Sequence, residues 1–195
     1  MSVLSEARAA DAAHLSALYR DSDDPWDFRD SDYEQFRFDR MVEAVEMVAP
    51  ARVLEVGCGN GEFARRIAKG RCYTGIEGAA RAVELARAAV PDGQILKMFL
   101  PAPLPGDAGE YDLIVLSEIL YFLDPGGVAD LARQIGEKHA DAWLLLVNYA
   151  GPTGHLLDGV QAERCFRDAL PHALEELHGF RHDRFSLSLC RQVVL

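Results

Sequence analysis

The stretch VLEVGCGNG, residues 53–61, decides the fold class of this chain. It joins a short apolar run, typical of a buried β-strand, to three glycines at alternate positions. Glycines let the backbone turn sharply after a strand, and they let a ligand lie against the main chain without meeting a Cβ atom. We therefore expect a ligand-binding turn at the carboxyl end of a buried strand.

Beyond this stretch, apolar strand-like runs alternate with helical patterns. We expect strands at 52–56, 72–77, 94–99, 111–117 and 142–149, and helices at 61–69, 79–90, 127–139 and 158–174. Such alternation implies a parallel sheet with crossover helices. Two further strands near 177–181 and 186–194, joined by a short link, predict an antiparallel hairpin at the sheet edge. The sequence thus predicts a Rossmann-like, doubly wound α/β fold with a mostly parallel seven-stranded sheet and a C-terminal antiparallel hairpin.

The segment before the first strand reads as two helices separated by a polar loop. We expect helices at 5–19 and 31–48, with the loop at 21–30 between them. Ser31 is a suitable N-cap, Glu34 completes a capping box, and Pro50 ends the second helix. We assign residues 1–48 as N-terminal helices and a lid that belong to the same domain as the main part, residues 49–195.

Composition narrows the class of protein. The chain has 195 residues, which suits one domain, and 49% of them are hydrophobic. No apolar run is long enough for a membrane helix, and the N-terminus lacks the pattern of a signal peptide, so we expect a cytoplasmic protein. The net charge of −11 disfavours nucleic acid as a partner. The four cysteines form no CxxC pair, which predicts reduced, buried thiols and no metal site.

Acidic residues around the glycines indicate the charge of the ligand. A dinucleotide-binding GxGxxG motif would place its third glycine at position 62, where this chain has Glu62. A carboxylate there repels a pyrophosphate but not a cationic sulfonium with an amino-acid tail. Glu55, inside the strand, also suits a cation. The chain contains no Tyr-x-x-x-Lys pair either, so a nicotinamide oxidoreductase is disfavoured.

Glu77 is the second candidate binding residue. It ends the next predicted strand, about twenty residues after the glycines. At that position an acidic side chain accepts hydrogen bonds from both ribose hydroxyls of an adenosine ligand. We therefore expect an adenosine-containing ligand.

Longer motifs carry a resemblance to a known family. The glycine stretch, TGIEGAARAVELARA (74–88) and YDLIVLSEILYFL (111–123) resemble class I S-adenosylmethionine-dependent methyltransferases. DPWDF (24–28) with Tyr33-Glu34, LSEILYFL (116–123) and VNYAGPTGHLLDG (147–159) resemble the nodulation protein S (NodS) family more specifically. That resemblance implies S-adenosylmethionine as the cofactor and the amine of an amino sugar or saccharide as the methyl acceptor.

The end of the third strand departs from the usual pattern. Methyltransferases of this kind generally place an Asp there to bind the adenine amino group, and this chain has Phe99 instead. We expect Met98, Phe99 and backbone groups to hold adenine by apolar contact. This predicts weaker discrimination of the base.

The N-terminal segment is predicted to cover the cofactor. Trp26, Phe28 and Tyr33 would form a lid over its methionine end, and Arg37 would pair with its carboxylate. The full set of expected cofactor-binding residues is Trp26, Tyr33, Arg37, Glu55, Gly57, Gly59, Glu77, Met98, Phe99 and Ser117.

Three residues are candidates for catalysis. Glu118 and Tyr121 follow the fourth strand, at the sheet edge where open α/β sheets bind ligands. Glu118 would accept the proton of an ammonium, and Tyr121 would hydrogen-bond the acceptor or line its pocket. His155, in the loop after the fifth strand, is a possible base because its ordinary pKa is near neutrality.

The sequence leaves the acceptor open. The leading hypothesis is N-methylation of an amino sugar or related small amine. The alternatives are O-methylation of a sugar or natural-product hydroxyl and a cofactor-binding regulator without catalysis. A monomer and a homodimer are both compatible with the sequence.

Overall fold

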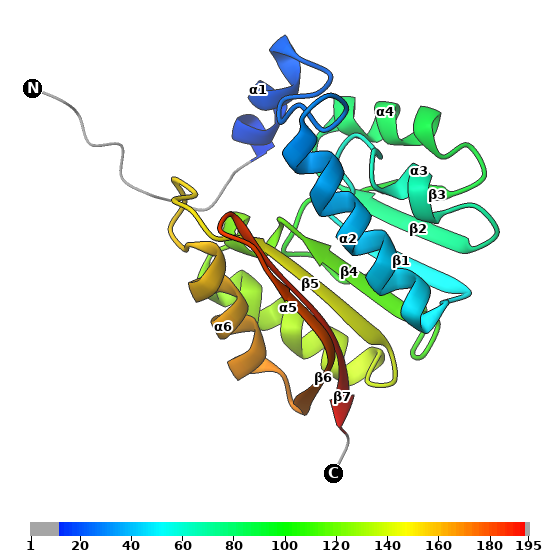
Figure 1. Ribbon diagram of the computed structural model, residues 1–195, viewed down its shortest axis with the longest axis vertical. Helices are drawn as coiled ribbons and strands as arrows, with labels where there is room; N and C mark the ends of the chain where they lie inside the picture. Colours follow the sequence, from blue (N-terminus) through cyan, green and yellow to red (C-terminus); the bar gives the residue numbers. More distant parts are fainter. Residues whose placement is uncertain (1–11, 194–195) are drawn as a thin grey trace, which may run out of the picture.

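One mixed sheet organises the protein, whose computed structural model describes residues 12–193 (Figure 1). The strands are β1 Arg52–Val56, β2 Cys72–Glu77, β3 Gln94–Lys97, β4 Leu113–Ser117, β5 Trp143–Tyr149, β6 Ala173–Arg181 and β7 Phe185–Val193. Their order across the sheet is β3-β2-β1-β4-β5-β7-β6. The first five are parallel, whereas β7 runs antiparallel to both β5 and β6. The predicted fold class, including the C-terminal hairpin, is confirmed.

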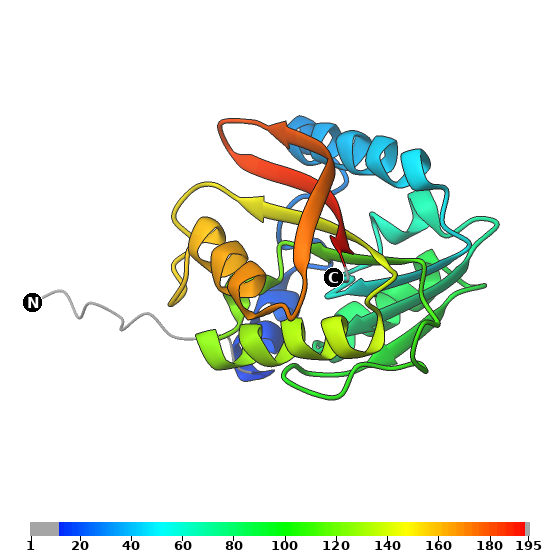
Figure 2. The same cartoon turned by 90° about the horizontal axis from the view of Figure 1, so that it is seen from below.

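Helices cover both faces of the sheet (Figure 2). They are α1 Ala12–Asp21, α2 Asp32–Val48, α3 Ala64–Ile67, α4 Ala80–Ala89, the short 3₁₀ helix η1 Leu120–Phe122, α5 Pro125–Lys138 and α6 Gly159–Ala169. Side chains of α2, α3 and α4 form one apolar cluster with the sheet, and those of α5 and α6 form another on the opposite face. Helix α1 packs against α4.

Strand β1 shows how the sequence produces these two layers. Val53 contributes to the cluster under α2, while Leu54 and Val56 contribute to the cluster under α5. Residues alternate between the faces of a strand, so an apolar run without polar interruption is buried on both sides. The exception inside β1 is Glu55, which is only 3% exposed.

Two predicted helices are shorter in the structure. The helix expected at 61–69 is reduced to the four residues of α3, because Gly61 has φ +83° and extends the turn. The helix expected at 158–174 ends at Ala169. Pro171 follows, and the extended conformation of Leu170 before it ends the helix.

Smaller corrections concern strand ends and side chains. β3 ends at Lys97, so Phe99 lies beyond the strand and not within it. Ser31 caps α2 as predicted, but the capping box is wrong because the carboxylate of Glu34 pairs with Arg37. All four cysteines are free, and Cys72 is exposed although we expected it to be buried.

The N-terminal segment follows the expected pattern where the structure describes it. Helix α1 continues to Asp21, two residues past its predicted end, so the irregular loop covers 22–31, and α2 begins and ends close to its predicted bounds. Residues 5–11 of the first predicted helix lie outside the described residues. Within residues 12–193, every helix falls short of the length or the apolar character that crossing a bilayer requires. The same residues hold no cluster of His, Cys, Asp or Glu side chains arranged to bind a metal.

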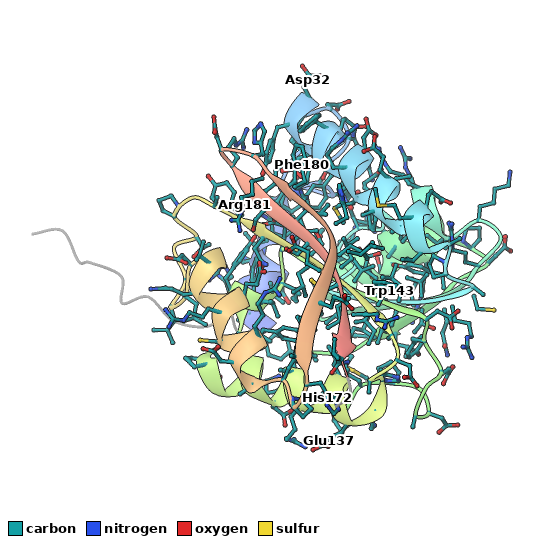
Figure 3. The ribbon with its side chains drawn as sticks, turned by 60° about the horizontal axis from the view of Figure 1, so that its bottom comes forward. Asp32, Glu137, Trp143, His172, Phe180 and Arg181 are labelled. Carbon is teal, nitrogen blue, oxygen red and sulfur yellow. The ribbon has the colours of Figure 1, made fainter. Side chains whose placement is uncertain are left out.

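The hairpin of β6 and β7 reaches the start of α2. Phe180 and Arg181 lie at the end of the hairpin toward Asp32, and Trp143 lies toward the other end of the sheet (Figure 3). The rings of Phe36 and Phe180 are 5.9 Å apart, which confirms the contact. The turn of the hairpin is thereby held beside the carboxyl end of β5.

Candidate functional site

A cavity of about 410 Å³ opens at the carboxyl ends of the parallel strands. Residues that follow β1, β2, β3, β4 and β5 line it, and α1, α2 and the loop between them close it from the N-terminal side. This edge is where open α/β sheets bind their ligands. All the predicted site residues line this one cavity: Trp26, Tyr33, Arg37, Glu55, Gly57, Gly59, Glu77, Met98, Phe99, Ser117, Glu118, Tyr121 and His155.

The glycine turn forms one wall of the cavity. Gly59 has φ +55°, a left-handed conformation that residues with side chains rarely adopt. A Cβ atom on Gly59 would lie 3.3 Å from the Tyr19 hydroxyl and 3.8 Å from Phe28. Glycine is therefore needed here both for the backbone conformation and for the space above it.

Glu77 connects this turn to β2. One carboxylate oxygen accepts a 3.0 Å hydrogen bond from the backbone N–H of Gly59, and the other accepts a 2.8 Å bond from Ala79. Burial raises the pKa of Glu77, while these backbone donors oppose the rise. Each oxygen keeps a second lone pair, so the fixed carboxylate can still accept from a vicinal diol.

Glu55 lies below the glycine turn. Its carboxylate accepts a 2.5 Å hydrogen bond from the hydroxyl of Tyr73 and is 3% exposed. Burial raises the pKa of Glu55 to about 7, although the Tyr73 hydroxyl opposes the shift. A buried carboxylate that titrates near neutrality responds strongly to a cation bound nearby.

Glu62 requires a correction to the charge argument. Its carboxylate is paired with Arg29 at 2.5 Å and with Arg65 at 2.9 Å, so it does not present an unbalanced negative charge to a ligand. Contrary to the prediction, Glu62 therefore does not by itself repel a pyrophosphate. A different feature disfavours a dinucleotide: α3, the helix after the glycines, has only four residues, which is too short for a phosphate-binding helix dipole.

The loop between α1 and α2 forms an aromatic wall. The rings of Trp26 and Phe28 are stacked with centroids 5.5 Å apart, and Trp26 contacts Tyr19 edge to face at 5.7 Å. Phe28 continues the row to Phe38 on α2. Tyr19 and Phe28 of this wall lie directly beside the glycine turn, close to Gly59.

Phe99 forms the wall that follows β3. It is 38% exposed, and its ring packs so closely over Gly78 that a Cβ there would lie 2.9 Å from it. The same Cβ would lie 3.4 Å from Leu15 of α1. Together with Met98, these residues form an apolar part of the cavity lining.

A buried ionic cluster lies at the carboxyl end of β4. The guanidinium of Arg37 donates to Glu34, and it donates to Ser117 Oγ at 3.0 Å. It approaches Glu118 Oε1 at 3.6 Å. Glu118 Oε2 accepts from the hydroxyl of Tyr121. Burial raises the pKa of Glu118, and Arg37 opposes the rise.

His155 lies at the same end of the cavity. Its ring is 4.5 Å from Phe122 and 5.9 Å from Tyr121, measured between centroids. His14 of α1 approaches it edge to face at 5.9 Å. The histidine therefore belongs to an aromatic group that borders the Glu118 region.

Several cavity residues escaped the sequence analysis. Tyr19 is 4% exposed, and among the described residues its hydroxyl finds no hydrogen-bond partner. Burial raises its pKa strongly, with a further contribution from the carboxylate of Glu77. Arg184, whose guanidinium stacks on the ring of Tyr33, comes from the β6–β7 turn. No local pattern marks either residue, because both reach the cavity through tertiary packing.

Local sequence patterns point to Glu34 and Asn60 as cavity residues. Glu34 lies one helical turn before Arg37, the spacing of an ion pair on one helix face. Asn60 stands between two glycines of the turn, and its side chain donates to Asp24 at 3.1 Å. The sequence analysis assigns Glu34 to a capping box and to the motif that resembles the NodS family, and not to the cavity.

Comparison with solved structures supports the fold. The N-methyltransferase NodS from Bradyrhizobium japonicum WM9, in complex with S-adenosyl-L-homocysteine, matches with a TM-score of 0.79 and 20% identity, over 93% of this chain and 97% of that one. A putative methyltransferase from Pseudomonas syringae matches with a TM-score of 0.67 and 24% identity, over 82% and 99% of the two chains. Magnesium protoporphyrin IX methyltransferase from Synechocystis PCC 6803, with bound S-adenosylmethionine, matches with a TM-score of 0.68 and 14% identity, over 94% and 99%.

A search of curated proteins by sequence found no match. The family description "Nodulation protein S (NodS)", in contrast, matches residues 9–132, well over half of the chain. These residues include the lid loop, the glycine turn, Glu77 and the Glu118 cluster. The fold is that of the S-adenosylmethionine-dependent methyltransferases, and the chain belongs to the nodulation protein S family.

Proposed function

We propose that this protein is an S-adenosylmethionine-dependent N-methyltransferase whose acceptor is the amine of an amino sugar or saccharide. One observation carries the proposal. A single cavity holds the glycine turn with Glu77 at one side and a buried carboxylate, Glu118, at the other. The family and the methyltransferase fold agree with this reading.

The residues of the cavity fit the cofactor. The glycine turn lines the cavity without side chains at Gly57 and Gly59, which suits the methionine portion, and the lone pairs of Glu77 suit the ribose hydroxyls. The apolar lining at Phe99 suits adenine. Trp26 belongs to the aromatic wall, whereas Tyr33 packs against Phe185 and Arg184. When bound, the cofactor supplies an electrophilic methyl group on a positively charged sulfur.

Charge and position favour an amine as the acceptor. Glu118 Oε1 is buried and lacks a hydrogen-bond partner among the described residues. An ammonium can donate to this oxygen and leave a neutral amine with a lone pair directed at the methyl group. Tyr121 holds the other carboxylate oxygen, and His155 borders the same space. Positioning of the two reactants in a dry cavity supplies the rest of the rate enhancement.

Calorimetry and a methyl-transfer assay test the proposal. S-adenosylmethionine and S-adenosylhomocysteine are expected to bind, NAD is not, and Glu77→Ala should weaken binding by about 1–3 kcal/mol. Methyl transfer is expected to glucosamine oligosaccharides with a free amine and not to fully N-acetylated ones. Transfer to the acetylated oligosaccharides would instead identify an O-methyltransferase, and binding without any transfer would indicate a regulator.

Two variants test the base. Glu118→Gln is expected to lower kcat by about 10²–10⁴-fold, the usual span for general acid–base catalysis. A comparable loss in His155→Ala, with removal of an acidic limb near neutral pH, would assign the proton to the histidine. If both variants keep kcat within a few-fold, no base is needed and both residues only line the pocket.

A further inference from the structure

The ionic cluster beside the acceptor space contains more negative than positive charge. Glu34 and Glu118 are both carboxylates, and Arg37 is the cation between them. Arg37 is 2% exposed, and the side chains of Glu34 and Glu118 are 13% and 19% exposed. When both carboxylates are ionised, the cluster therefore carries one net negative charge in surroundings that water screens poorly.

The donors of Arg37 are distributed unequally between the two carboxylates. Nε donates to Glu34 Oε2 at 2.9 Å, and a terminal nitrogen donates to the same oxygen. The other terminal nitrogen donates to Ser117 Oγ at 3.0 Å and reaches Glu118 only at 3.6 Å. That last distance allows ionic attraction but exceeds a hydrogen bond.

The backbone fixes Glu118 in this arrangement. Its φ is +57°, and its N–H donates to the carbonyl of Val147 on β5 at 2.8 Å. Oε2 accepts from Tyr121, which leaves Oε1 as the unpartnered oxygen. Glu118 therefore offers one free acceptor oxygen because Arg37 is engaged elsewhere.

We propose that Glu34 is a positioning residue: by engaging the Arg37 guanidinium, it keeps Glu118 Oε1 free to take a proton from the acceptor ammonium. Without Glu34, the guanidinium can form a bidentate pair with Glu118, which is the geometry that an arginine and a carboxylate prefer. The free oxygen and the net negative charge would then both be lost. The inference rests on the proposed function, because it concerns how the proposed base is kept available.

Proton transfer to Glu118 and methyl transfer to the amine together conserve atoms and charge. The acceptor ammonium passes one proton to Glu118 Oε1, which becomes a neutral carboxylic acid. The lone pair left on nitrogen forms the bond to the methyl carbon, and the electron pair of the breaking carbon–sulfur bond goes to sulfur. Positive charge thus moves from sulfur to the methylated nitrogen, while the proton remains on Glu118.

Groups from each neighbouring element act on Glu118. Burial raises its pKa, Arg37 and Tyr121 lower it, and Glu34 raises it. The backbone N–H of Tyr149 at the end of β5 also lowers this pKa by hydrogen bonding, and Tyr33 of α2 faces the carboxylate. In Glu34→Gln, the loss of a like charge and the closer approach of Arg37 act in the same direction, so Glu118 should stay ionised to lower pH.

The main test compares Glu34→Gln with a matched change on the same helix. Glu43→Gln removes the same charge from an exposed pair with Arg40, also three residues apart. Glu34→Gln is expected to lower kcat at least tenfold on a free-amine glucosamine oligosaccharide and to move its acidic limb to lower pH. Glu43→Gln is expected to change neither. Both variants should bind S-adenosylhomocysteine within about threefold of the wild type.

A double-mutant cycle separates positioning from simple structural support. If Glu34 acts mainly through Arg37, then Glu34→Gln should lower kcat much less in an Arg37→Met background, where only the direct like-charge effect of Glu34 on Glu118 remains. An equal loss in both backgrounds would overturn the inference, as would an unchanged kcat in Glu34→Gln. Thermal melting of each variant identifies any loss that comes from unfolding.

The titration of the Glu118 carboxyl group can be measured without knowing the methyl acceptor. The carboxyl carbon of Glu118, assigned in labelled protein by comparison with Glu118→Gln, is expected to titrate at lower pH in Glu34→Gln than in the wild type. An unchanged titration would refute the positioning role. Absence of methyl transfer by the wild type, with the expected titration shift present, would refute the proposed function and leave the link between Glu34 and Glu118 standing.

Discussion

Asp24 accepts a 3.1 Å hydrogen bond from the side-chain amide of Asn60, which joins the lid loop to the glycine turn. The same carboxylate accepts from the backbone N–H groups of Phe28 and Arg29, both at 3.0 Å. One side chain thus orders the loop internally and attaches it to the proposed cofactor site.

Asp24→Ala is expected to loosen the lid. The change leaves two backbone donors without their acceptor and removes one of the two hydrogen bonds of the Asn60 amide, which still donates to the carbonyl of Asp23 at 3.2 Å. The closed loop should lose about 1–3 kcal/mol. Affinity for S-adenosylhomocysteine should fall, and backbone hydrogens at residues 24–29 should exchange faster. Asp30→Ala, an exposed change in the same loop, is the control and should alter neither. Equal effects of the two variants would contradict the attachment.

Gly59→Ala is expected to weaken cofactor binding about tenfold or more, whereas Gly70→Ala is not. Both glycines have positive φ, so both alanines carry left-handed strain of roughly 1–2 kcal/mol. Of the two, only Gly59 lines the cavity. A Cβ atom on Gly70 meets nothing within 4 Å. Calorimetry measures affinity, and melting curves measure the shared strain. A similar loss of affinity in both would mean that strain alone is responsible.

Phe99→Ala is expected to weaken cofactor binding more than Phe99→Leu, by about 1 kcal/mol, because leucine keeps most of the buried apolar area. Phe36→Ala is the control: Phe36 is 39% exposed against 38% for Phe99, but it lies outside the cavity. Equal binding by the two Phe99 variants would show that another group contacts adenine.

The affinity for S-adenosylmethionine is expected to rise from pH 6 to pH 8. The affinity for S-adenosylhomocysteine, the demethylated product, is expected to rise much less. The pKa of Glu55 is raised to about 7, so below that pH the carboxyl group is mostly protonated. A bound sulfonium favours the ionised form, and binding therefore becomes tighter as pH rises through 7, whereas a neutral thioether has little such effect. Glu55→Gln should remove the difference between the two ligands.

Stability at mildly acidic pH is expected to depend on His139. Its ring is fully buried beside Tyr111, neither nitrogen has a hydrogen-bond partner among the described residues, and burial, with a smaller effect of Lys138, lowers its pKa. The unfolded chain takes up a proton as pH falls through about 6.5, and the folded chain does not, so stability is lost below that pH. His139→Phe should flatten the fall of the melting temperature there. His178→Phe, on the partly exposed edge strand, should keep the wild-type slope.

The sequence predicted most of the sheet because its strands are buried on both faces. An uninterrupted apolar run such as the one around Leu113 has few alternatives to an inner strand. The length of the helix that follows the glycine turn was harder to predict. The three glycines after β1 were recognised as a turn, but the effect of Gly61 on the next helix depends on its backbone conformation, which sequence alone does not give. Pro171, in contrast, is a local signal in the sequence that predicts the end of α6.

In the candidate site, too, the sequence predicted some residues, while others depend on contacts that only the folded structure shows. Glu77 and Glu118 were predictable because they follow strands, and strand ends converge at one edge of a parallel sheet. The pairing of Glu62 with Arg29 was not, since it joins the lid loop to the glycine turn across 33 positions of sequence. The role of a charged residue depends on its partner, and that partner was set by tertiary packing.

The position of β7 between β5 and β6 affects how the chain can fold while the ribosome is still making it. Although it is the last of the described strands along the chain, it lies between β5 and β6, so β6 has no neighbouring strand until residues 185–193 have been made. During synthesis the first five strands can assemble while β5 still has a bare edge with Leu145 and Val147 beside it. At ordinary elongation rates the ribosome needs about 2–9 s to pass from Tyr149 to Val193. In that interval the nascent protein offers an unpaired apolar strand to other chains, and folding helpers that bind such edges would act then.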